Sequence, residues 1–200
     1  MFVITADQVN SRERPDAVEE TITALSSALG ERLTLPPDRS AGDEVQLLTE
    51  DGSTALDAIL RLTRTRGWSV GLGIGGVRRP LGTSIRESTG EAFIAARAAV
   101  ARAKNKATRF ALERDGVGEV TKDTEALIDL LLLLRGRRSE EGWQLYDLRM
   151  SAMTQAEAAK RLGISPQAAS DRAQAAELKA EFAVTEGLAR LLQRLGTENS

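Results

Sequence analysis

The hydrophobic pattern of the chain changes at one point, Gly116-Val117-Gly118, and this change constrains the fold more than any other feature. Before it, short apolar runs typical of strands alternate with segments whose apolar residues recur at helical spacing. From Thr121 onward, every segment has the helical pattern. The sequence therefore predicts an α+β domain over residues 1–115 and an all-α domain over residues 116–200.

The first domain is predicted to contain its elements in the order β-α-β-β-α-β-α-β. The strands are expected around residues 2–6, 33–35, 45–48, 68–74 and 108–112. The helices are expected at residues 18–29, from a cap at Ser53 or Thr54, and at residues 91–104. This order predicts a single sheet in a palm or ferredoxin-like arrangement, with helices packed against it.

The composition excludes several classes of chemistry. The 200 residues include neither Cys nor His, so disulfides, Cys/His zinc sites and thiolate or imidazole catalysis are ruled out. The net charge is −2, which gives no overall electrostatic signal for nucleic acid. No apolar run reaches the length of a membrane helix, and the start lacks the basic residues of a signal peptide. We therefore expect a cytoplasmic protein with no membrane partner.

Residues 154–177 have the pattern of a helix-turn-helix. Thr154-Gln155-Ala156-Glu157 forms a capping box at the start of a short helix that ends at Gly163. Ser165 then caps a second helix that has Pro166 at its first position. This spacing predicts two closely crossing helices, of which the second is suited to the DNA major groove.

Polar side chains of this segment are candidates for contact with DNA. Gln can read adenine, Arg can read guanine and Ser can contact either base, whereas Lys and Arg on the first helix suit phosphates. The predicted DNA-binding residues are Thr154, Gln155, Lys160, Arg161, Ser165, Gln167, Ala168, Ser170, Asp171 and Arg172. Because one such helix buries too little surface for tight specific binding, a homodimer on paired half-sites is expected.

The run "MTQAEAAKRLGISPQAASDRAQAA" resembles the helix-turn-helix of sigma-factor region four and of MarR-like regulators. This resemblance implies a DNA-binding transcription regulator. The negative charges of Asp171 and Glu177 and the lack of a basic excess favour a different hypothesis. In that alternative the segment is an adaptor that docks on a protein partner and no longer binds DNA.

A glycine motif, Gly71-x-Gly73-x-x-Gly76, follows a predicted strand. A dinucleotide-binding fingerprint requires a helix to begin at the third glycine. Here Val77-Arg78-Arg79-Pro80 follows instead, which is typical of an extended segment or loop. We therefore interpret these glycines as residues of a crowded strand and turn.

Three acidic residues are predicted to meet at one edge of the sheet. Asp7 ends the first strand, and Asp43 and Glu44 lie at a hairpin turn. If these strands are neighbours, their carboxylates converge, and paired carboxylates bind Mg²⁺ that in turn holds a triphosphate. The alternative is ordinary turn chemistry, because Asp commonly ends strands and forms hairpin turns.

The first domain resembles the palm-like fold of class III nucleotide cyclases and GGDEF domains. The resemblance lies in "FVITADQV", "SAGDEVQLL", "VGLGIGGV" and "GEAFIAARAAV". It implies Mg²⁺ and a nucleotide as ligands of Asp7, Asp43, Glu44 and Arg97. Phe93 occupies the Asn position of the Asn-x-Ala-Ala-Arg helix signature. The signature is therefore incomplete and predicts no catalytic residue, although a metal-dependent nucleotidyl transferase or cyclase is kept as the enzymatic alternative.

More closely, the first domain resembles the SatD family of small bacterial proteins. The shared pattern is "D…GDE.Q", which falls on Asp7 and on Gly42-Asp43-Glu44-x-Gln46. This resemblance implies a fold rather than an activity. The expected role of the first domain is to sense a small ligand or to dimerise.

Overall fold

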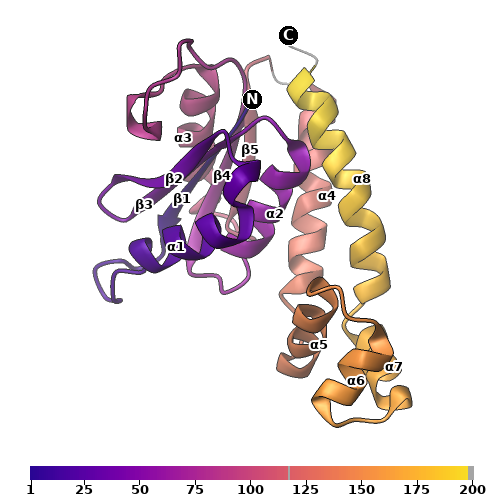
Figure 1. The fold of residues 1–200 in the computed structure, drawn as a ribbon. Coiled ribbons are helices and arrows are strands. Elements are labelled where there is room, and N and C mark those ends of the chain that lie inside the picture. Colours follow the sequence, from indigo (N-terminus) through magenta and orange to yellow (C-terminus); the bar gives the residue numbers. More distant parts are fainter. Residues whose placement is uncertain (117, 198–200) are drawn as a thin grey trace. The chain divides into compact units, whose positions relative to one another are not determined.

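The computed structural model describes residues 1–116 and 118–197, so Val117 of the predicted breakpoint lies outside the described residues (Figure 1). The strands are β1 (Phe2–Gln8), β2 (Leu35–Ala41), β3 (Glu44–Thr49), β4 (Trp68–Ile74) and β5 (Phe110–Arg114). The helices are α1 (Val18–Leu29), α2 (Gly52–Leu62), α3 (Glu91–Ala103), α4 (Glu119–Arg135), α5 (Glu140–Met150), α6 (Gln155–Leu162), α7 (Pro166–Ala175) and α8 (Leu178–Thr197). The predicted α+β fold, with a mixed first half followed by helices, is confirmed.

The five strands form one sheet in the order β2-β3-β1-β4-β5. β1 is antiparallel to both of its neighbours, whereas β4 and β5 are parallel and α3 connects them. Within this sheet Asp7 lies opposite Glu44 on β3 and opposite Ser69 on β4.

The glycines of β4 allow α3 to pack directly on the sheet. A methyl group at Gly71 would overlap the backbone of Val100, and one at Gly73 would overlap the backbone of Ala92. No helix begins at Gly76, and α3 starts only at Glu91. The interpretation of these glycines as residues of a crowded strand is therefore confirmed.

The start of α2 differs from the prediction. Asp51, rather than Ser53 or Thr54, is its N-cap, and the Asp51 carboxylate accepts hydrogen bonds from the backbone and hydroxyl groups of both residues. Burial alone raises the pKa of the Asp51 carboxyl, but these hydrogen bonds outweigh it and lower the pKa to about 2. Asp51, Ser53 and Thr54 are all residues that can cap a helix, and Asp51 does so because its two carboxylate oxygens accept the N–H groups of the other two.

Contacts divide the chain into two compact units. The first unit comprises residues 1–129 together with residues from 187 onward, and the second comprises residues 130–186. The boundary predicted at residue 115 falls within the first unit, because the beginning of α4 is held against the sheet. Glu125 accepts the N–H of Leu112 at 2.7 Å and forms ion pairs with Arg102 and Lys106.

Residues 187–197 complete the first unit from the far end of the sequence. The Gln193 side chain accepts the backbone N–H of Gly52 at 2.7 Å. Gly196 lies so close to the Phe2 ring that a Cβ there would approach a ring carbon to 2.5 Å. Among the helices of residues 1–116 and 118–197, none is long and apolar enough to cross a membrane.

Candidate functional sites

The capping box that the sequence predicts for α6 is present in the second unit. Thr154 accepts the backbone N–H of Glu157 at 3.2 Å, and the Glu157 carboxylate accepts the N–H of Thr154 at 2.7 Å. The backbone and hydroxyl donors of Thr154 hold the pKa of the Glu157 carboxyl below its usual value. The first turn of α6 is therefore fixed by its own neighbouring residues.

The turn between α6 and α7 also has the predicted form. Gly163 adopts the left-handed conformation with φ of 66°, which a residue without a Cβ does at little cost. Ser165 then caps α7 by accepting the N–H of Ala168 at 3.1 Å, with Pro166 at the first helical position. Ala159 of α6 and Ala169 of α7 are buried, and their small size allows the two helices to pack closely.

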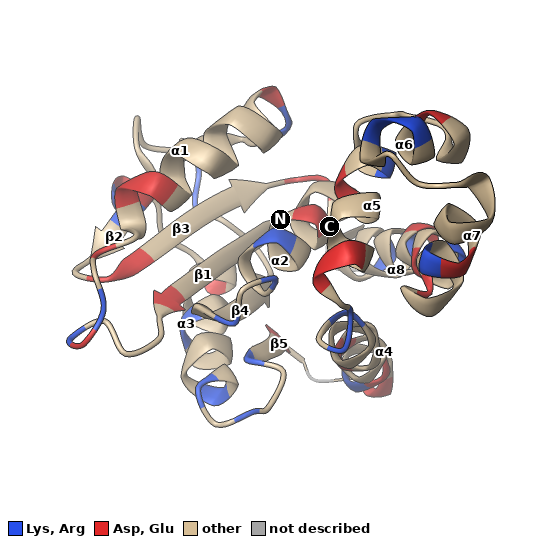
Figure 2. Cartoon of the chain, turned by 90° about the horizontal axis from the view of Figure 1, so that it is seen from below, with Lys and Arg blue, Asp and Glu red and all other residues tan. Residues whose placement is uncertain are grey.

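The predicted DNA-binding residues lie on the surface of this helix pair. The most exposed are Thr154, Lys160, Arg161, Ser165, Gln167, Ser170 and Asp171, whereas Gln155, Ala168 and Arg172 are half-buried. Figure 2 shows basic colour along α6 and both charge signs on α7. On α7, Gln167 donates a hydrogen bond from Nε2 to the Asp171 carboxylate at 2.9 Å.

A buried ion cluster, which sequence reasoning missed, lies at the centre of the second unit. The Glu181 carboxylate pairs with both Arg135 and Arg138, and all three side chains are almost fully buried. Both guanidinium groups lie over the Trp143 ring, at 4.8 and 4.5 Å from its centroid. The half-buried rings of Trp143 and Tyr146 therefore pack against both buried cations.

The same cluster fixes the end of α7. Arg138 donates a hydrogen bond to the carbonyl of Ala176, the C-cap residue of α7, at 2.9 Å. A cation at a helix C-terminus satisfies free carbonyl groups and interacts favourably with the helix dipole. The candidate DNA-contacting helix is thus capped by Ser165 at its start and held by Arg138 at its end.

The acidic residues of the first unit are brought together only in part. Asp7 and Glu44 are direct register partners on β1 and β3, and the Asp43 carbonyl accepts the N–H of Gln8 at 3.1 Å. Asp7 is paired with Lys104 at 2.6 Å. Glu44 accepts hydrogen bonds from Ser40 and from Gln46.

Protein donors therefore occupy the carboxylates of Asp7 and Glu44, two of the three that the sequence suggested as Mg²⁺ ligands. The described residues contain no group of three or more acidic side chains placed to hold a metal ion. Arg97 is exposed on α3 and has no ion-pair partner within the described part of the chain. A divalent cation at this edge would have to displace Lys104 from Asp7.

No family model, curated protein or solved structure matches this chain. The resemblances to the SatD family, to nucleotide cyclases and to helix-turn-helix regulators therefore remain predictions made from short motifs.

Proposed function

We propose that this chain is a cytoplasmic DNA-binding protein, a transcription regulator that places α7 in the major groove. The observation that carries the proposal is the helix pair α6–α7, whose caps are complete and whose polar face is exposed. Gln167, Ser170 and Asp171 on this face make no contribution to the core of the second unit. A polar helical face held rigidly at both ends suits base recognition.

The hydrogen bond between Gln167 and Asp171 determines what α7 offers to a base. Asp171 occupies one N–H of the Gln167 amide and leaves the other N–H and the carbonyl oxygen for a partner. One donor beside one acceptor complements the major-groove edge of adenine. The Asp171 carboxylate is itself an acceptor suited to the amino group of cytosine.

The second unit has no excess of basic residues, so its binding to phosphates would depend on where individual cationic side chains lie rather than on its net charge. Residues 130–186 contain equal numbers of basic and acidic side chains. Lys160 and Arg161 are exposed on the last turn of α6, and the hydroxyl groups of Thr154 and Ser165 mark the starts of the two helices. This small set of donors predicts a shallow dependence of DNA affinity on salt, since each phosphate contact adds a slope of about −0.9.

We further propose that the protein binds as a homodimer. A single recognition helix buries little surface, and paired half-sites supply the remaining affinity. Leu127, Leu130 and Leu133 of α4 are exposed, and such apolar surface favours contact with a second copy. Leu127 belongs to the first unit and Leu130 and Leu133 to the second, and the further role that we propose for the first unit is to contribute to the dimer or to sense a ligand.

The test is fluorescence anisotropy of labelled random-sequence duplex DNA at low and moderate salt. We expect binding that weakens with salt and that the double variant Lys160→Ala/Arg161→Ala reduces by about tenfold or more. Lys122→Ala, which removes an exposed cation from the first unit, is the matched control and should leave the affinity unchanged. If the folded protein does not bind DNA at low salt, the proposal is wrong. Asp171 on the exposed face would then favour docking on a basic protein surface.

A further inference from the structure

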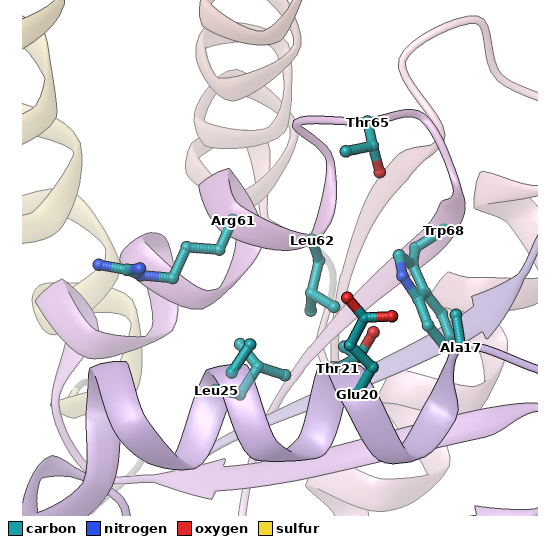
Figure 3. A pocket seen from close by; sticks show the side chains of 9 residues that line it. Ala17, Glu20, Thr21, Leu25, Arg61, Leu62, Thr65 and Trp68 are labelled. Carbon is teal, nitrogen blue, oxygen red and sulfur yellow. The ribbon is translucent and has the colours of Figure 1, made fainter. Parts of the chain in front are cut away.

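A pocket of about 320 Å³ opens between α1 and α2 in the first unit (Figure 3). Leu25 of α1, Leu62 at the end of α2 and Trp68 of β4 form its apolar walls, and Glu20 and Arg61 supply charged groups. The volume is near the lower limit of small-molecule sites, which are about 300–1,000 Å³. The pocket therefore has room for one ring or two fused rings.

The indole of Trp68 offers an unused hydrogen-bond donor to this pocket. Trp68 is only 5 % exposed, and its N–H has no hydrogen-bond partner in the part of the chain that the structure describes. Figure 3 shows the indole nitrogen on the side of the ring that faces Glu20 and Leu62. This N–H is not one of the buried polar atoms that lack a partner among the described residues, so it is open to the pocket, where an acceptor atom of a ligand can reach it.

Glu20 supplies the complementary acceptor. Its carboxylate points toward the indole, and it forms no ion pair within residues 1–116 and 118–197. The nearby Arg61 does not neutralise it, because Arg61 is paired with Asp57 at 2.7 Å. A donor and a negatively charged acceptor therefore lie side by side between apolar walls.

We propose that this pocket binds a small, flat heteroaromatic amine. A ring nitrogen of the ligand accepts the hydrogen bond of the Trp68 N–H, and an adjacent amino group donates to the Glu20 carboxylate. The ring faces pack against Leu25 and Leu62. The charge of Glu20 strengthens its hydrogen bond and selects against ligands that carry an acceptor in place of the amino group.

This site is distinct from the acidic edge of the sheet. Trp68 and Gly71 are three residues apart on β4, so their side chains lie on opposite faces, and Gly71 faces α3. Asp7, which lies opposite Ser69, is on the α3 face as well. Ligand binding here is also independent of DNA binding by α7, so either proposal can fail without the other.

The indole N–H signals in a proton–nitrogen NMR spectrum test the proposal directly. The chain has two Trp residues, so Trp68 gives one of only two indole signals and Trp143 provides an internal control. Titration with 4-aminoquinazoline should shift the Trp68 signal downfield and saturably while the Trp143 signal stays in place. The Trp68→Phe variant lacks the Trp68 signal, so comparison of the two spectra identifies both the Trp68 and the Trp143 signals.

Two matched comparisons of affinity test whether the amino group of the ligand binds to the Glu20 carboxylate. Quinazoline, which lacks the amino group, should bind about tenfold more weakly, and Glu20→Gln should weaken 4-aminoquinazoline by a similar factor. Glu19→Gln, on the same turn of α1 but outside the pocket, should bind like the unmodified chain. Glu20 is exposed, so its replacement leaves the fold intact. An unshifted Trp68 signal at millimolar ligand, or equal affinities across these comparisons, overturns the proposal.

Discussion

Gln167 and Asp171 lie one turn apart on the exposed face of α7, and the Gln167 amide donates a 2.9 Å hydrogen bond to the Asp171 carboxylate. The bond fixes the orientation of an amide that would otherwise rotate freely. It also places a negative charge on the surface that we propose meets DNA. Selectivity and affinity are therefore opposed at this pair, because the group that orients Gln167 also repels phosphates.

Asp171→Ala should separate these two effects. Removing the charge should raise the affinity for random-sequence duplex DNA at low salt by about fivefold, equivalent to roughly 1 kcal/mol. Loss of the hydrogen bond should at the same time broaden the set of sequences selected from a random pool. Anisotropy and sequencing of the bound pool measure the two outcomes. Glu140→Gln, an exposed acid on α5, is the control, and an affinity no higher than that of this control would contradict the prediction.

Glu181→Gln should destabilise the second unit strongly. The substitution removes the carboxylate charge that the buried guanidinium groups of Arg135 and Arg138 share, and breaking such a buried pair costs about 3–5 kcal/mol. Urea unfolding followed by circular dichroism, with Glu140→Gln as the control, measures the loss. A cost below about 1 kcal/mol would show that the other groups around the two cations, such as the aromatic rings and, for Arg138, the Ala176 carbonyl, stabilise them without the Glu181 charge.

Gly73→Ala should destabilise the first unit by about 3 kcal/mol. The added methyl group meets the backbone of Ala92 and Ala96 rather than a movable side chain, so α3 has to shift away from β4. Gly187→Ala is the matched control, because nothing lies within 4 Å of its Cβ and Ala favours a helix. We expect thermal unfolding to show a lower midpoint for Gly73→Ala and an unchanged or slightly raised one for Gly187→Ala. Equal midpoints would mean that α3 does not rest on β4 as described.

Asp51→Ala should reduce stability in a way that depends on pH. At neutral pH the loss of the N-cap should cost about 1 kcal/mol. The folded pKa of Asp51, about 2, lies below its ordinary value of 3.8. The stabilisation is therefore fully present above about pH 4 and is lost as the pH falls toward 2. Urea unfolding of both proteins across this range should show the difference shrinking on acidification, and a constant difference would rule out the carboxylate as its source. Glu13→Ala, an exposed acid in the same unit, should show no such trend.

Features that neighbouring residues encode were predictable from the sequence. The caps at Thr154 and Ser165 each bind a backbone N–H three residues further along, and Gly163 ends its own helix, so each is encoded locally and was found as predicted. The order of strands and helices follows from hydrophobic periodicity alone. The predicted start of α2 was wrong, because several neighbouring polar residues can cap a helix and their spacing alone does not show which of them does so.

Features that depend on distant residues were not predictable. Arg138 and Glu181 are 43 residues apart, and Asp7 and Lys104 are 97 residues apart, so no local pattern pairs them. The observed boundary between the units lies after residue 129 rather than after residue 115 for the same reason, because the ion pairs of Glu125 hold the start of α4 against the sheet. The pocket beside Trp68 forms only when α1, α2 and β4 come together, and nothing in their separate sequences indicates it.

The return of residues 187–197 to the first unit has a consequence for synthesis on the ribosome. Gln193 and Gly196 complete contacts with Gly52 and Phe2, yet they are translated after the whole of the second unit. The sheet therefore cannot form its contacts with residues 187–197 until these residues leave the ribosome. Residues 130–186 leave it earlier, and all residues of the second unit are then present. In the nascent chain, the helical unit in the middle of the sequence is the first that can fold to completion, and the N-terminal sheet is finished last.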